Sequence, residues 1–238
     1  MTFGYSHGWQ ECRLCYTGAH SISLPNNWML HNNPGYAGSS NPSTLILGFS
    51  KGANQNEIAI QGAYDQVPFA GMRDRLQQLL VALDLMPTDR RIDQMLTAHE
   101  VEFGAASLVR CSLCRKKGDH YVTSGGLVTE GFRVPEIKAI IERCAVTFLS
   151  RPPESLRRVI LLGTNRIYIQ KTMALFQHLY PDFSRVNEVA FQARGALWIY
   201  VAHPSKANGS FQAWQAAEPG SSAGQKCIQA RQALAAYC

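Results

Sequence analysis

Four short apolar runs punctuate the chain, each rich in β-forming residues and bounded by glycine or polar residues. They lie at 44–49, 103–110, 158–163 and 197–202. Their length and continuous hydrophobicity are typical of strands buried on both faces of a parallel sheet. We therefore expect four central strands.

Between these runs, apolar residues recur at helical spacing. The segments in question are 71–84, 135–149, 164–180 and the tail 221–237. Pro135 suits the first turn of a helix, and Thr164 is expected to cap the next one. A further helix is expected to begin near Thr88. Helices between strands predict a three-layer α/β/α sandwich around a central four-stranded parallel sheet.

Composition agrees with one folded domain over residues 1–238. The chain has 46% hydrophobic and 17% charged residues, which argues against disorder. Residues 1–43 are rich in Gly, Asn, Pro and Ser, so we expect an irregular segment there. Cys111 to Gly131 is basic and contains glycine, so a loop is expected.

The chain shows no sign of a membrane or secreted protein. No apolar run approaches the roughly 20 residues that a membrane helix needs, and the first residues do not resemble a secretory signal. We expect a cytoplasmic, monomeric protein. The net charge of +6 and pI near 9.0 favour a polyanionic partner such as nucleic acid, although many enzymes are mildly basic.

Seven cysteines are present, and in a cytoplasmic chain they indicate metal binding or burial rather than disulfides. Cys12 with Cys15, and Cys111 with Cys114, form two C-x-x-C pairs. Such pairs can place both thiolates on one metal centre through a tight turn.

In parallel sheets the functional loops follow the carboxyl ends of the strands. Three distinctive segments occupy such positions: 48–52, the stretch from Cys111, and 203–205. We expect them to converge on one edge.

Several segments follow one another over roughly residues 12 to 210: 45–52 (LILGFSKG), 68–71 (PFAG) with Leu76, 107–111 (SLVRC), 144–149 with 159–163, and 203–205 (HPS). Their order resembles the uracil-DNA glycosylase superfamily, in particular its iron–sulfur members. The resemblance implies a glycosylase-like fold and DNA as partner.

By this resemblance Cys12, Cys15, Cys111 and Cys144 hold a [4Fe–4S] cluster. A structural zinc through Cys12, Cys15, Cys111 and Cys114 is the alternative, although its two pairs are farther apart than in a compact zinc ribbon. A chain without metal is the third possibility.

The resemblance also implies roles in taking a base out of DNA and breaking its N-glycosidic bond. His203 is the expected donor to the departing base, and Phe69 the ring on which the base stacks. The alternatives are that His203 is an ordinary loop histidine and that Phe69 is an ordinary core phenylalanine.

Ser205, Lys206 and Asn208 are expected to meet phosphates, or else to form a solvated loop. Phe211 is a candidate wedge into the base stack.

Two positions depart from the family pattern. Gly48 opens the loop that carries the water-activating residue in related enzymes, but Phe49 and Ser50 follow it and neither is a carboxylate. Ser107 stands where an amide reads uracil, and a serine cannot make the two-point contact of an asparagine. The loop after Gly52 is long, so Asn54, Glu57 or Asp65 is a candidate to reach the pocket.

The sequence therefore supports three hypotheses. The first is a DNA glycosylase acting on uracil or another damaged base. The second is a nucleic-acid-binding protein that keeps the fold and metal without turnover. The third, a nucleotide-binding α/β protein, is disfavoured because 48–52 fits neither G-x-G-x-x-G nor the phosphate loop.

Overall fold

The computed structural model of the chain describes residues 4–16, 18, 20–52, 55, 58, 64–118, 120–123 and 126–237. At its centre lie the four expected strands, all parallel, in the order β6–β5–β9–β12. Their bounds are β5 Thr44–Gly48, β6 Phe103–Ser107, β9 Arg158–Leu162 and β12 Ala196–Val201. The prediction of four central strands is confirmed, with the second ending at Ser107 instead of Arg110.

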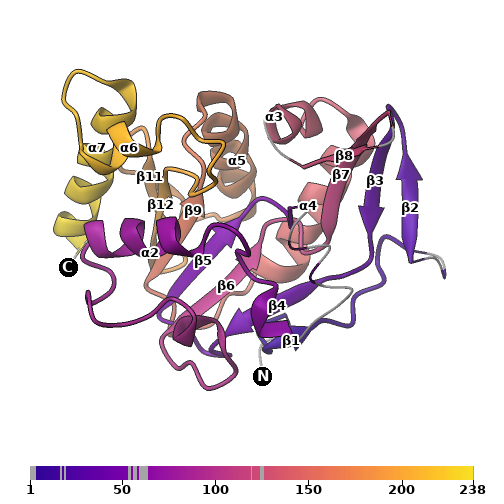
Figure 1. Cartoon of the computed structure of the whole chain (residues 1–238), viewed down its shortest axis with the longest axis horizontal. Helices are drawn as coiled ribbons and strands as arrows, with labels where there is room; N and C mark the ends of the chain where they lie inside the picture. Colours follow the sequence, from indigo (N-terminus) through magenta and orange to yellow (C-terminus); the bar gives the residue numbers. More distant parts are fainter. Residues whose placement is uncertain are drawn as a thin grey trace.

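Antiparallel strands extend this sheet at both edges (Figure 1). β4 (Gly35–Gly38) and β1 (Gly8–Trp9) lie beyond β6, whereas β11 (Ala190–Ala193) and β10 (Ser184–Arg185) lie beyond β12. The central sheet is therefore mixed and eight-stranded, so the prediction of a four-stranded parallel sheet holds for its centre and is wrong for its edges.

A second, antiparallel sheet projects beside the first, at the right of Figure 1. Its order is β2–β3–β7–β8, with bounds β2 Ser21–Leu24, β3 Trp28–His31, β7 Ser112–Lys117 and β8 His120–Val122.

Two predictions fail here. The segment 1–43 is not irregular, because it contributes β1 to β4. The segment 111–131 is not a loop, because it forms β7, β8 and the short helix α3 (Leu127–Gly131). The pairing of β3 with β7 joins residues about 80 positions apart, such as Leu30 with Leu113, and local sequence patterns do not report such contacts.

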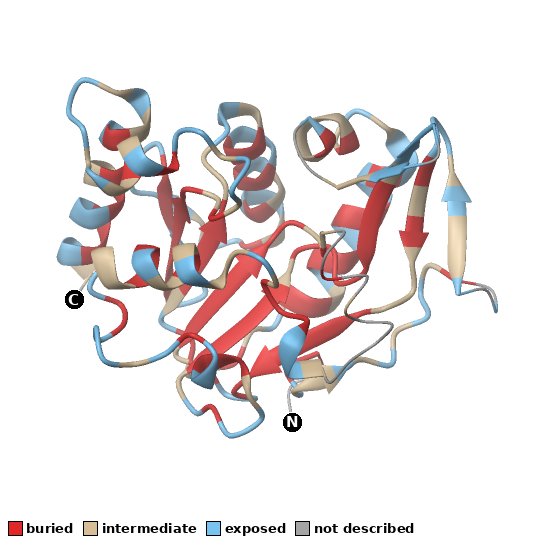
Figure 2. Cartoon of the chain, viewed as in Figure 1, coloured by how far each residue is buried: buried red, intermediate tan, exposed pale blue. Residues whose placement is uncertain are grey.

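Helices cover both faces of the central sheet. On one face α4 (Pro135–Leu149) and α5 (Arg166–Leu179) pack against alternate strand residues such as Leu47 and Leu161. On the other face α2 (Arg73–Ala82), α6 (Phe211–Gln215) and α7 (Ser222–Tyr237) pack against the intervening residues, such as Ile46 and Ile160. The buried strands between two helical layers (Figure 2) confirm the three-layer arrangement.

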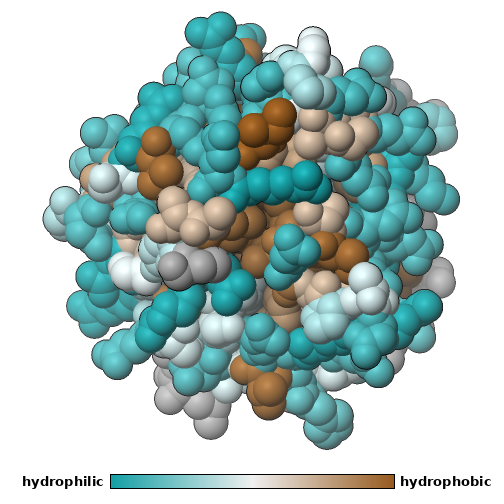
Figure 3. Space-filling model, turned by 90° about the vertical axis from the view of Figure 1, so that its left-hand side faces the viewer, coloured by the Kyte–Doolittle hydropathy of each residue, from teal (hydrophilic) through white to brown (hydrophobic). Residues whose placement is uncertain are grey.

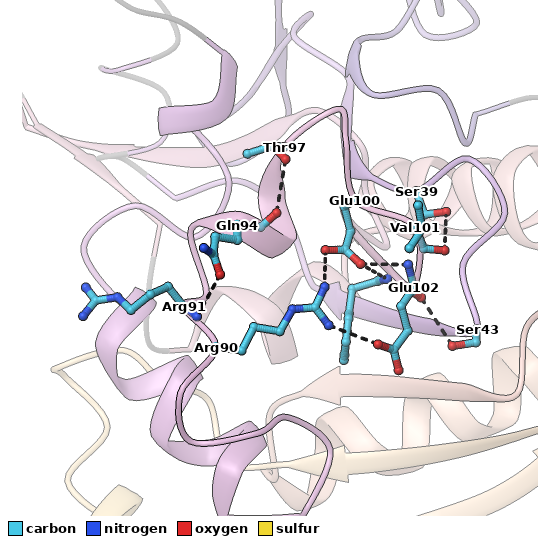
Figure 4. Close-up of polar contacts among 10 residues, drawn as sticks. Ser39, Ser43, Arg90, Arg91, Gln94, Thr97, Glu100, Val101 and Glu102 are labelled. Carbon is cyan, nitrogen blue, oxygen red and sulfur yellow. Dashed lines mark hydrogen bonds and ion pairs between the residues drawn. The ribbon is translucent and has the colours of Figure 1, made fainter.

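The helix expected near Thr88 is absent: the segment forms turns and a single 3-10 turn, Gln94–Leu96. Polar groups of this segment instead form the hydrogen bonds and ion pairs drawn in Figure 4. Buried Glu100 accepts hydrogen bonds from Arg90 at 2.6 Å and from the backbone N–H groups of Glu102 and Phe103. These bonds fix the entry into β6.

The other expected helices, α2, α4, α5 and α7, lie at their predicted positions. α5 is capped by Asn165, whose side-chain oxygen accepts from the N–H groups of Ile167 and Tyr168, and not by Thr164. The face at the left of Figure 1 is largely hydrophilic, with a group of hydrophobic side chains near its middle (Figure 3). Within the described part of the chain, every helix is too short or too polar to cross a membrane.

Candidate functional site

A pocket opens at the carboxyl edge of the central sheet, between the ends of β5 and β6 and the segment that leads into α2. Its empty volume is about 290 Å³, a figure that includes space open to solvent. The described residues that line it are Gly35, Lys51, Gln55, Tyr64, Val67, Pro68, Phe69, Ala105, Ala106 and Ser107.

Gly48 is not itself a lining residue, but it pairs in register with Ser107, which lines the pocket. A Cβ atom on Gly48 would lie 3.6 Å from the Ser107 hydroxyl and 3.8 Å from the Phe69 ring. Backbone bonds continue past the strand end, since the Leu108 N–H donates to the Gly48 carbonyl at 2.8 Å. Three residues that the sequence singled out therefore meet at one place.

Phe69 is held in an unusual conformation. Its φ is +55° and its side chain is 5% exposed, a combination that is rare for a bulky residue and costs backbone strain. The neighbouring turn is fixed by Arg73, whose Nε donates to the Pro68 carbonyl at 3.0 Å. Strain of this kind gathers at ligand sites, so the geometry supports Phe69 as a pocket residue.

Lys51 is a pocket residue that the sequence did not identify. It is 4% exposed and its ammonium donates to the backbone carbonyls of Asn33, at 2.7 Å, and Arg110. Burial lowers the pKa of Lys51 to about 8. A lone lysine inside an otherwise apolar strand-end loop was the available signal. Gln55, which is buried, and Tyr64, which is partly exposed, add polar groups to the same wall.

Other candidates from the loop lie elsewhere. Phe49 packs in the core, with ring centroids 6.1 Å from Phe132 and 6.2 Å from Tyr168, because alternation along the strand directs it away from Gly48. Ser50 is partly exposed and does not line the pocket.

The loop after Gly52 also contains Asn54, Glu57 and Asp65, the three other candidates for water activation. Asn54 and Glu57 lie outside the described residues. The Asp65 carboxylate is bonded to His7 at 2.8 Å and does not line the pocket. Among the described lining residues there is thus no carboxylate.

His203 lies just beyond β12, on the same edge of the sheet but outside the pocket wall. Two strand spacings, about 10 Å, separate β5 from β12. The Ser205 N–H donates to His203 Nδ1 at 3.2 Å, so in the neutral ring the proton sits on Nε2. Burial lowers the pKa of His203, which keeps the imidazole neutral. The arrangement presents an N–H donor at this edge.

The loop after His203 is ordered by its own polar groups. Asn208 donates to the His203 carbonyl at 2.8 Å, and Arg75 donates to the Ser205 carbonyl at 2.9 Å. Lys206 is exposed and free to meet a phosphate. Phe211 is 1% exposed beneath Arg75, so its proposed role as a wedge is wrong.

Cysteines from three segments lie near one another. Cys12 and Cys15 belong to the loop between β1 and β2, Cys111 follows β6, and Cys144 lies in α4. Arg143 bridges two of these segments, since its Nη1 donates to the Leu14 carbonyl at 3.1 Å and to the Cys15 sulfur at 3.4 Å.

Burial raises the pKa of the Cys144 thiol to about 12. Backbone N–H groups also act on two of the sulfurs, from Arg110 on Cys144 and from Asn33 on Cys111. Among the described residues, however, these four cysteines do not form a group placed to hold a metal ion.

The zinc alternative depends on Cys114. This residue lies in β7, with its sulfur 3.5 Å from His31 Nε2 and 3.8 Å from the Met29 carbonyl. Burial raises its pKa to about 11. No three His, Cys, Asp or Glu side chains of the described residues are placed to share one ion, so the structure does not distinguish the set with Cys144 from the set with Cys114.

The sequence matches no protein-family model, and a search of curated proteins finds no significant relative.

Proposed function

We propose that the chain is a DNA glycosylase with a uracil-DNA glycosylase-like fold, which hydrolyses the N-glycosidic bond of uracil or another damaged base. The parallel strand order β6–β5–β9–β12 and the position of the pocket at its carboxyl edge support this proposal. The single observation that carries it is the meeting of Gly48, Phe69 and Ser107 around that pocket.

In this proposal the pocket receives an extruded base. The ring of Phe69 stacks on the base, and the Ser107 hydroxyl makes one hydrogen bond with its polar edge. Gly48 leaves room because any side chain there would contact both partners. A pocket with one hydroxyl selects less sharply than an amide, so we propose a base specificity broader than uracil alone.

His203 then acts on the departing base. The bond between C1′ and the base nitrogen breaks with its electron pair on the base, and the Nε2–H of neutral His203 donates to the base oxygen that gains negative charge. Water adds to C1′, and its proton passes to the base anion. Free enzymes often hold such donors at long range until substrate binds, which is consistent with His203 lying outside the pocket wall.

Cys12, Cys15, Cys111 and Cys144 would hold the [4Fe–4S] cluster, whose contribution when bound is to tie three segments of chain together next to the pocket. We assign the cluster no part in bond breaking.

A second candidate is a nucleic-acid-binding protein without turnover. It is favoured by one observation: no carboxylate lines the described pocket to activate water. The two candidates share the pocket and the DNA partner and differ only in base release.

The test is base release from single- and double-stranded oligonucleotides that carry uracil or hypoxanthine, followed by alkaline cleavage of the abasic product. We expect cleavage at one or more of these bases. Salt-sensitive binding to the same oligonucleotides without any cleavage would overturn the glycosylase and leave the binding protein.

A further inference from the structure

The hairpin formed by β7 and β8 carries positive charge into solvent at one edge of the second sheet (Figure 1). Lys116 and Lys117 end β7, and both side chains are exposed. Arg115 precedes them, but its guanidinium is paired with the Glu130 carboxylate at 2.6 Å. The sequence adds one acidic residue, Asp119, which lies outside the described residues. The two lysines are therefore the charges that the hairpin offers to a partner.

The pairing register divides the second sheet into an inner and an outer face. Trp28, Leu30 and Leu113 are buried in the core, so their face is the inner one. Directly opposed residues of paired strands share a face, and the faces alternate along each strand. The outer face therefore carries Ser21, Ser23, Met29, His31, Ser112, Cys114, Lys116 and Tyr121.

Tyr121 is an exposed aromatic ring on this outer face. Its side chain is 46% exposed, and its ring lies 6.0 Å from the ring of His31 at an interplanar angle of 80°. Lys116 is its direct neighbour across the hairpin. Proteins that bind single strands of nucleic acid combine such parts, because unpaired bases stack on aromatic rings while cations meet the phosphates.

The hairpin also begins next to the pocket. Thr123 follows β8 directly, and a Cβ atom on Gly52 would lie 3.7 Å from its hydroxyl. Gly52 in turn follows Lys51, which lines the pocket. A strand of nucleic acid that lies along the hairpin therefore passes close to the pocket wall.

We propose that the outer face of this hairpin binds single-stranded nucleic acid, with a base stacked on Tyr121 and phosphates at Lys116 and Lys117. The inference rests on the proposed function, from which it takes DNA as the partner. Stacking on Tyr121 requires an unpaired base, because the bases of a duplex stack on one another. The substrate class that follows is single-stranded DNA, one arm of which lies on the hairpin while the target base enters the pocket.

Binding to an oligothymidylate of about 15 nucleotides tests this surface, a length near the upper end of what one single-strand-binding fold covers. This probe contains no damaged base, so the measurement is independent of base release. Fluorescence anisotropy gives the dissociation constant at several salt concentrations, for the single strand and for a duplex of the same length.

The variants separate the ring from the charges. Tyr121→Leu removes the ring and keeps apolar bulk, whereas Tyr121→Phe keeps the ring. A double variant combines Lys116→Ala with Lys117→Ala, and Lys171→Ala, at an exposed lysine of α5, is its matched control. Thermal melting checks the fold of each variant. Should Tyr121→Leu fail to fold, the double lysine variant still tests the surface.

We expect the native protein to bind the single strand more tightly than the duplex. Tyr121→Leu should weaken single-strand binding by about tenfold, the loss expected for one stacked base, and Tyr121→Phe should bind like the native protein. The double lysine variant should reduce the salt dependence of binding by about two phosphate contacts. Lys171→Ala should leave it unchanged.

Native binding by both Tyr121→Leu and the double lysine variant would overturn this surface and leave the glycosylase intact. Tighter binding of the duplex, unaffected by Tyr121→Leu, would also overturn it. Weaker binding by these variants, in a protein that releases no base from any oligonucleotide, would uphold the surface and refute the glycosylase.

Discussion

Gly48 and Ser107 face each other across neighbouring parallel strands, in register and close enough that one added carbon on Gly48 would contact the Ser107 hydroxyl. Ser107 and Phe69 both line the pocket, and the Phe69 ring approaches Gly48 from the segment before α2. The φ of Gly48 is not positive, so its backbone conformation does not require a glycine.

The first prediction concerns that space. Gly48→Ala should fold normally, because its Cβ contacts at 3.6 and 3.8 Å are ordinary, and unfolding free energy should change by about 1 kcal/mol or less. Base release should fall by about tenfold, equivalent to about 1.4 kcal/mol. Gly220→Ala, where a Cβ meets nothing within 4 Å, is the matched control. Equal activity in the two variants would mean that no base enters beside Gly48.

The second prediction concerns the donor. His203→Gln should slow base release by roughly 100- to 1,000-fold, the usual loss when one donor to a developing anion is removed. Single-turnover rates at saturating enzyme would separate this effect from weaker binding. His178→Gln, on the exposed side of α5, should behave like the native protein. A His203→Gln variant with native rates would remove His203 from the reaction.

The third prediction is a pH dependence of stability. Burial lowers the pKa of His203 in the folded protein, so below about pH 6.5, the ordinary histidine value, the unfolded chain binds the proton first. Stability from this residue is complete above pH 6.5 and is lost as the pH falls. His203→Gln should therefore flatten the fall in melting temperature between pH 7 and 5. Some fall should remain, because burial also lowers the pKa of His31. An unchanged pH profile would show that His203 does not stay neutral.

The fourth prediction distinguishes the metal sets. Cys144→Ser should lose iron and melt at a lower temperature, because it removes one ligand of a centre that joins three segments. Cys114→Ser and Cys227→Ser change buried cysteines outside this set and should keep their iron. Iron content and thermal melting measure both effects. If Cys114→Ser lost metal while Cys144→Ser kept it, the zinc set would be correct.

The fifth prediction concerns DNA. Lys206 is exposed beside the loop that carries His203, so Lys206→Ala should weaken binding about equally for different sequences. It should also reduce the salt dependence of binding by about one phosphate contact. Lys171→Ala provides a comparison at a surface distant from that loop in sequence. No change in the salt slope would place the DNA elsewhere.

Sequence patterns predicted the centre of the fold better than its borders. The four parallel strands and helix 135–149 follow from local hydrophobicity, which burial on both faces imposes. β4 and β7 escaped notice because glycine and lysine residues mask them and because they pair with the distant strands β6 and β3. Turns replace the expected helix near Thr88, and Glu100 forms side-chain bonds there that no periodicity reveals.

The residues of the candidate site were likewise predicted only in part. Gly48, Phe69 and Ser107 come together because parallel strands bring their carboxyl ends to one edge. The burial of Lys51 and Arg110 was not anticipated, since charged residues are expected outside by default and their burial is a property of the packed structure. Phe49 follows Gly48 in the expected loop, but its ring packs against Phe132 and Tyr168 in the core.

The most direct test of the account is a crystal structure of the protein with an oligonucleotide whose deoxyuridine resists cleavage. The account predicts the base extruded against Phe69, with Ser107 in hydrogen-bond contact and His203 Nε2 facing a base oxygen. A complex in which the base stays stacked in the DNA, or in which DNA binds away from this edge of the sheet, would contradict it.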